Sequence, residues 1–215
     1  MGKNYIKKIK KEVFMLQSKD LTGDLRRANL RNTDLSYVNL RNLDLSYADL
    51  RNTDLRNANL TNVNLTCADL REINLADTHF IYADLSYANL SGVDFNNTDL
   101  SYTNLRNANL SGAKLTANIL RGANLCGVNL TNADLANTNL TGANLTRSNL
   151  VLANLSNSDL SNSNLRSADL RDANLRSADL RNVNLRDADL RGANLSGVNL
   201  SGADLIGAKF DVVVE

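Results

Sequence analysis

The chain of 215 residues contains no proline and no tryptophan, and it has only one histidine and two cysteines. With His79 as the sole histidine, the sequence offers no Ser/His/Asp constellation and no histidine metal cluster. Cys67 and Cys126 cannot build a disulfide framework. Neither the GxxxxGK[ST] nor the GxGxxG phosphate-binding motif occurs. These absences predict a non-catalytic protein without cofactor or metal.

Long apolar runs are also missing, since none approaches the roughly 20 residues of a membrane helix. The formal net charge is +1, which points to neither a nucleic acid nor an acidic substrate. The basic start of the chain has no apolar core of a secretory signal. We therefore expect a reduced, cytoplasmic, soluble protein that binds neither nucleic acid nor membrane directly.

Leucine dominates and recurs at every fifth position. Every residue whose number is a multiple of five, from Leu25 to Phe210, is leucine except Phe80, Phe95 and Phe210. A straight helix would turn each successive leucine by about 140°, and a straight strand would alternate its face. The chain must therefore turn once per repeat, so that each leucine returns to the inside.

The other four positions of the repeat support this interpretation. Two residues before nearly every leucine stand small or β-branched residues, such as Ala28 and Thr33, which should point inward beside it. Between them stands Asp or Asn almost every time, and this residue should point outward. Nine of the 11 glycines lie two residues after the central residue, where many repeats carry asparagine. Both residue types tolerate left-handed backbone, so this position predicts a corner.

Units such as ADLRN, ANLSG and ADLRG resemble the A(D/N)LXX motif of the pentapeptide repeat family. The resemblance implies an all-β solenoid, a right-handed quadrilateral β-helix with four repeats, or 20 residues, in each coil. On that basis the 38 repeats would form about nine and a half coils over residues 20–211, followed by a short tail at 212–215. Each coil would protect the next one.

Both ends of a solenoid expose core and unpaired backbone. Residues 1–19 predict a basic amphipathic α-helix that caps the first coil, with a membrane-surface or nucleic-acid helix as the alternative. At the other end no helix is predicted, and some members of the family dimerise there. We expect a homodimer through an apolar end that consists of Leu205, Phe210, Val212, Val213 and Val214.

The repeat at residues 116–120 departs from the pattern. Asn118 occupies the small inward position and Ile119 the outward polar position. A buried amide without a partner costs about 1–3 kcal/mol. Either neighbouring backbone satisfies the Asn118 amide or this side of the coil is locally twisted, and we expect a local bulge at this repeat.

An aromatic cluster is the best candidate interaction patch. Tyr82 and Tyr102 are 20 residues apart and should stack at one corner of adjacent coils, with His79 and Ile81 on the same side and Tyr87 one corner further on. Exposed tyrosine is enriched at protein interfaces. The alternative is a tyrosine column that only stiffens the corner.

Arginines form two candidate basic belts near the two ends. The 20-residue coil should place Asp49 and Asp69 beside the first column of arginines, either as a salt ladder that aids solubility or as an interaction surface. The belts consist of Arg31, Arg51, Arg71, Arg166, Arg171, Arg176, Arg181, Arg186 and Arg191.

Two hypotheses of function remain. The first is a rigid scaffold that displays side-chain columns to a protein partner whose identity the sequence does not give. The second follows from the resemblance, because some members of the family are DNA-mimicking modulators of a type II topoisomerase, DNA gyrase. An enzyme is not expected.

Overall fold

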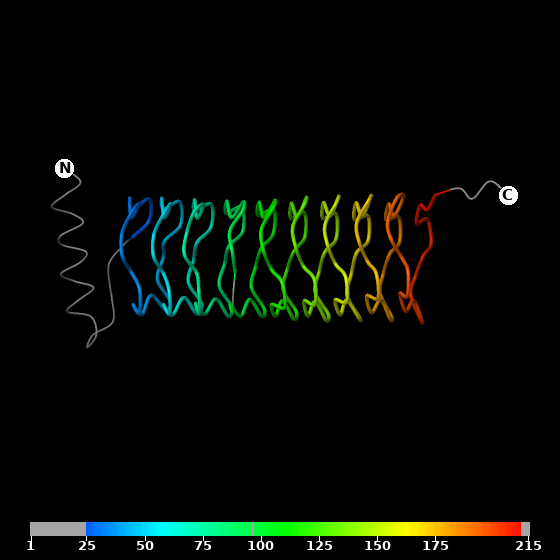
Figure 1. Cartoon of the computed structure of the whole chain (residues 1–215). Coiled ribbons are helices and arrows are strands. Elements are labelled where there is room, and N and C mark those ends of the chain that lie inside the picture. Colours follow the sequence, from blue (N-terminus) through cyan, green and yellow to red (C-terminus); the bar gives the residue numbers. More distant parts are fainter. Residues whose placement is uncertain (1–24, 96, 212–215) are drawn as a thin grey trace.

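The computed structural model describes residues 25–95 and 97–211, which form a rod of stacked coils that follow one another along its axis (Figure 1). Isolated parallel bridges join residues that are 20 apart, from Asn29↔Asp49 to Asp189↔Lys209. Each coil is therefore 20 residues long, as predicted. The number of coils in the whole chain stays a prediction.

Each repeat is one bridge residue followed by a tight turn. In the first turn, the Ala28 backbone N–H donates to the Leu25 carbonyl at 3.0 Å, and Arg27 between them has a φ of 57°. A positive φ at the third residue is what a type II turn requires. Every fifth residue from Arg27 to Gly207 has a positive φ. The predicted corner is confirmed, and within the described ranges the sides are too short to form longer strands.

The core is a column of leucines inside the rod. From Leu30 to Leu190, the residues at five-residue spacing, including Phe80 and Phe95, are at most 2% exposed. Burying one such side chain stabilises the fold by about 1.5–3 kcal/mol. Several inward hydroxyls bond to the backbone, as where Thr53 Oγ1 donates to the Leu30 carbonyl of the preceding coil at 2.9 Å. The buried hydroxyls of Ser148 and Ser163 have no hydrogen-bond partner among the described residues.

The bulge predicted at residues 116–120 is wrong. Ile119 pairs in register with Asp99 and Asn139, and Ala117 has the usual corner φ of 58°. The inward slot accommodates Asn118 at 4% exposure without a change of register. Its Nδ2 makes only a long 3.5 Å contact with the Thr116 carbonyl, and its Oδ1 is buried without a hydrogen bond. The irregularity therefore remains as an unpaired acceptor in the core.

Exposure rises in the last described coil. Leu205 is only partly buried, Phe210 is 40% exposed and Ile206 is 63% exposed. The helical cap predicted for residues 1–19 lies outside the described residues, and so do Val212, Val213 and Val214. No α-helix occurs within residues 25–95 and 97–211, and none there has the length and hydropathy to cross a membrane.

Candidate interaction surfaces

All five tyrosines in the described part of the chain stand at left-handed corners: Tyr37, Tyr47, Tyr82, Tyr87 and Tyr102. The rings of Tyr82 and Tyr102 stack, with centroids 5.4 Å apart and an interplanar angle of 16°. The stacking predicted from their 20-residue spacing is confirmed. Offset aromatic stacking stabilises such a pair by about 0.5–1.5 kcal/mol.

A left-handed backbone is unfavourable for a bulky residue. It costs a residue with a Cβ about 1–2 kcal/mol, while asparagine and glycine adopt it more easily. Tyr82 and Tyr102 nevertheless adopt φ values of 61° and 58°. Their side chains are 59% and 46% exposed, so burial offsets only part of that cost. The same left-handed φ occurs at every corner from Arg27 to Gly207, so what distinguishes this corner is the exposed pair of stacked rings.

In the coil after Tyr102, the same corner is occupied by a glycine. Gly122 follows Tyr102 by one coil, and a Cβ at Gly122 would lie 2.7 Å from Cε1 of the Tyr102 ring. The ring of Tyr102 therefore leans over the next coil, where only glycine leaves it room. The exposed aromatic surface extends along the rod from Tyr82 over the Gly122 corner.

Two apolar side chains, Ile81 and Ile119, lie on the side of the coil that leads to this corner. His79 pairs with Asp99, and Asp99 pairs with Ile119, so these three form one outward column. Ile119 is 44% exposed, which sequence reasoning predicted without joining it to the patch. Its position 40 residues after His79, two coils on, is the signal that could have placed it there. We call the combined set the tyrosine surface: His79, Ile81, Tyr82, Tyr87, Tyr102 and Ile119.

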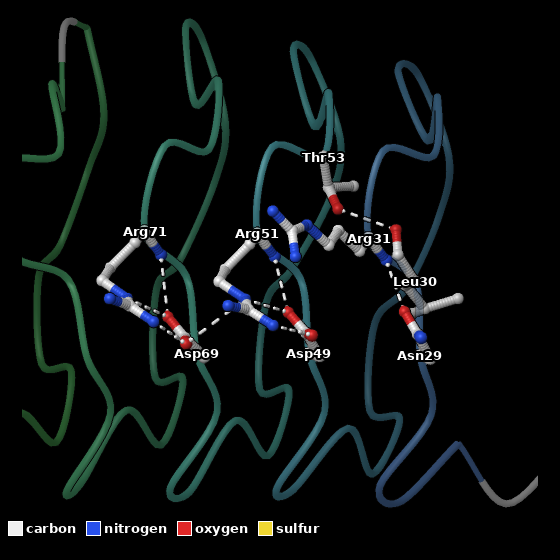
Figure 2. Close-up of polar contacts among 8 residues, drawn as sticks. All are labelled: Asn29, Leu30, Arg31, Asp49, Arg51, Thr53, Asp69 and Arg71. Carbon is white, nitrogen blue, oxygen red and sulfur yellow. Dashed lines mark hydrogen bonds and ion pairs between the residues drawn. The ribbon is translucent and has the colours of Figure 1, made fainter.

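Two arginines of the first belt, Arg51 and Arg71, pair with aspartates (Figure 2). Arg51 and Arg71 each hold the aspartate two residues earlier, with NH2–Oδ2 distances of 2.6 and 2.7 Å to Asp49 and Asp69. Arg51 Nε also lies 3.5 Å from Oδ2 of Asp69 in the next coil. Hydrogen bonds from these guanidinium groups hold the pKa of Asp49 and Asp69 below its ordinary value.

The second belt repeats the arrangement. Arg171, Arg181 and Arg191 each hold the aspartate two residues earlier at 2.6 Å. The Arg191 guanidinium lowers the pKa of Asp189 to about 2.

The remaining arginines of the belts differ. Arg166 and Arg186 reach Asp187 and Asp204 of the next coil at 3.6 and 3.1 Å. Within the described ranges, Arg31 and Arg176 have no ion pair. Most of the predicted basic belts are therefore side-chain pairs rather than open cationic surface.

Groups that bind metals or react are sparse. Among the described residues, no three His, Cys, Asp or Glu side chains come together in a way that could hold a metal ion. Cys67 and Cys126 are both free thiols. What the rod presents to its surroundings is thus a set of side-chain columns.

The sequence profile of the family described as Pentapeptide repeats matches in eight copies that together span residues 24–211. The chain belongs to the pentapeptide repeat family, whose solved structures are right-handed β-helices. The prediction of an all-β solenoid with this repeat is confirmed.

Solved structures of the family resemble the chain to different degrees. HetL, a protein involved in heterocyst differentiation regulation from the cyanobacterium Nostoc sp. strain PCC 7120, is 36% identical over 85% of this chain and 89% of its own, with a TM-score of 0.37. QnrB1, a plasmid-mediated fluoroquinolone resistance protein, is 24% identical over 89% and 86%, with a TM-score of 0.44. A thylakoid-lumen protein of Arabidopsis thaliana is 29% identical over 57% and 76%, with a TM-score of 0.25. Among curated proteins, no sequence matches the chain.

Proposed function

We propose that the protein is a non-catalytic scaffold that binds a protein partner through the tyrosine surface. The observation that carries the proposal is the stacked and exposed pair Tyr82–Tyr102. Ile119 and Ile81 place apolar side chains on the adjoining side. Aromatic residues with a polar end are common energetic centres of interfaces.

The rigidity of the rod supports the same role. Backbone hydrogen bonds join neighbouring coils at side after side, as where the Asp84 N–H donates to the Val63 carbonyl at 2.9 Å. The side chains of the tyrosine surface therefore stand on a rigid backbone, which loses little conformational entropy on binding. Such preorganisation favours affinity.

Partner capture in the native cell tests this proposal. The triple variant Tyr82→Asn, Tyr102→Asn, Ile119→Asn removes the apolar groups and keeps residues that this fold already accepts at those positions, such as Asn62 and Asn139. The matched control is Leu152→Asn, which replaces a 54% exposed side chain at a left-handed corner two and a half coils beyond Tyr102. We expect the triple variant to lose a partner that the control retains. If both variants capture the same proteins, the tyrosine surface is not the interface.

The topoisomerase hypothesis remains as the alternative. A DNA mimic needs a continuous negative surface, whereas arginines alternate with aspartates along both arginine belts. That alternation favours the general scaffold. A gyrase supercoiling assay with the protein titrated in, with and without a quinolone, separates the two hypotheses. Inhibition of gyrase or protection from the drug at micromolar protein would favour the topoisomerase hypothesis.

The homodimer predicted through Leu205, Phe210 and the following valines stays a separate proposal. The exposed Phe210 and Ile206 support it. Light scattering across a concentration series tests it, and a monomer at every concentration would contradict it.

A further inference from the structure

The charge of the rod is not evenly distributed. No lysine or arginine occurs between Arg71 and Arg106, while this stretch contains five acids, Glu72, Asp77, Asp84, Asp94 and Asp99. We call residues 72–105 the acidic band. By contrast, residues 25–71 contain seven arginines and five aspartates. The acidic band also carries Tyr82, Tyr87 and Tyr102, so the aromatic side chains of the tyrosine surface coincide with a stretch that has acids and no lysine or arginine. One of these acids, Asp94, pairs with Lys114 beyond the band at 3.7 Å.

Two of these acids flank the stacked tyrosines. Asp84 lies two residues after Tyr82 on one side of the corner, and Asp99 lies three residues before Tyr102 on the other. Each uses Oδ1 to accept a backbone N–H, from Ser86 at 2.9 Å and from Ser101 at 2.8 Å. Asp84 Oδ1 also accepts the Asn104 Nδ2–H at 3.2 Å. Neither forms an ion pair with any residue that the structure describes. Each carboxylate therefore keeps an oxygen for a donor from outside.

The molecule already shows how its corners bind a guanidinium group. The Arg27 guanidinium carbon lies 5.6 Å from the ring centroid of Tyr47, which stands one coil later at the same kind of left-handed corner. Elsewhere an outward aspartate receives an arginine through two hydrogen bonds, as Asp49 does from Arg51 at 2.8 and 2.6 Å. Planar guanidinium suits both contacts better than the point charge of lysine does.

We propose that the Tyr82–Tyr102 corner, with Asp84 and Asp99 beside it, binds an arginine side chain in an exposed segment of the protein partner. The acidic band provides the aromatic face and the carboxylates and has no arginine of its own to occupy them. This inference rests on the proposed function and gives the chemistry of the partner. Negative charge and the absence of cations in the band make the surface complementary to a basic segment.

Synthetic peptides test the inference on the whole chain. The probe is a heptapeptide with three arginines separated by glycines, compared with the same peptide carrying lysine or the neutral isostere citrulline. Because the chain has no tryptophan, tyrosine fluorescence reports binding, and calorimetry gives the dissociation constants. We expect the arginine peptide to bind about tenfold more tightly than the lysine peptide, and the citrulline peptide to show no binding. Equal affinity for the arginine and lysine peptides would overturn the inference.

Two double variants locate the binding. One double variant carries Tyr82→Asn and Tyr102→Asn, and the other carries Asp84→Asn and Asp99→Asn. We expect each to lower the affinity for the arginine peptide about tenfold. Tyr37→Asn replaces another exposed tyrosine at a left-handed corner and should leave affinity unchanged. Unchanged affinity in both double variants would overturn the inference. If the tyrosine variant unfolds, the aspartate variant decides, because asparagine is common in that outward column.

The result is distinguishable from a failure of the proposed function. If the triple variant loses its cellular partner while peptides bind without preference for arginine, the scaffold proposal stands and the arginine inference fails. If the peptides bind as expected but partner capture is unaffected, the corner binds arginine and the proposed interface is wrong.

Discussion

Residues 72–105 and residues 165–191 share the same buried column of leucines but present different side chains to solvent. The second stretch carries six arginines and five aspartates, most of them paired within the rod. The acidic band carries five acids, three exposed tyrosines and no arginine or lysine. The repeat thus determines the inside, while the outward positions are free to differ between coils.

This difference teaches where function can reside in such a rod. In residues 165–191 most of the arginines form ion pairs with aspartates of the rod, so a partner would have to displace an existing contact. In the acidic band, Asp84 and Asp99 form no ion pair within the described residues. A surface that leaves its polar groups available is the better candidate for recognition.

The largest expected effect tests whether the leucine core is packed equally well in residues 72–105 and in residues 165–191. Leu90 and Leu170 occupy the same side of the coil and are 0% and 1% exposed. Leu90→Ala and Leu170→Ala should each destabilise the fold by about 2–5 kcal/mol, because each leaves a cavity in a close-packed column. Urea unfolding, followed by circular dichroism, measures both. A loss below about 1 kcal/mol for Leu90→Ala alone would show that the acidic band is packed more loosely.

A smaller effect concerns Asn118, just beyond the acidic band. Its buried Oδ1 has no hydrogen bond, whereas Thr138 at the same position of the next coil donates Oγ1 to the Leu115 carbonyl at 2.8 Å. Asn118→Thr should raise the free energy of unfolding by about 1–2 kcal/mol, since the hydroxyl can bond and the volume is similar.

The reciprocal change Thr138→Asn is the matched control, and it should lower the free energy of unfolding by a similar amount. Both are read from urea midpoints. An unchanged midpoint in Asn118→Thr would mean that the acceptor is satisfied in solution, for instance by water.

Sequence predicted the inside of this molecule better than its outside. The five-residue period allows one arrangement that buries every leucine, and the glycines and asparagines mark the corners. The Tyr82–Tyr102 stack followed from their spacing alone. The bulge at Asn118 was predicted wrongly, because the width of the inward slot depends on packing that a single sequence does not show.

Two outward features needed the coil register to be recognised. The gap in arginine between Arg71 and Arg106 is visible in the sequence, but only the 20-residue register places Asp84 and Asp99 beside the stacked rings. The contact of Arg27 with Tyr47 depends on rotamers and lies beyond sequence reasoning. The local pairs of Asp49 with Arg51 and Asp69 with Arg71 followed from a spacing of two residues.

The smallest expected effect is the pH dependence of those pairs. Arg71 donates to both carboxylate oxygens of Asp69 at 2.9 and 2.7 Å and holds its pKa below the ordinary value of 3.8. The pair therefore stabilises the fold at pH values above the unfolded pKa, and this contribution is lost as the pH falls through the lowered folded pKa. Exposed pairs of this kind contribute little to stability. Arg71→Gln should lower the free energy of unfolding slightly at pH 7, and the difference from the unmodified protein should vanish toward pH 2.

Arg106→Gln is the matched control for this last effect, because Arg106 has no ion pair within the described residues and bounds the acidic band. In the Arg106→Gln variant, the urea midpoint should change between pH 7 and pH 2 as it does in the unmodified protein. If Arg106→Gln changed the pH profile as much as Arg71→Gln does, the charges would act through the overall field of the rod rather than in pairs. The contrast between the paired arginine belts and Asp84 and Asp99, which form no ion pair within the described residues, would then lose its physical basis. Both acids would already be compensated at a distance.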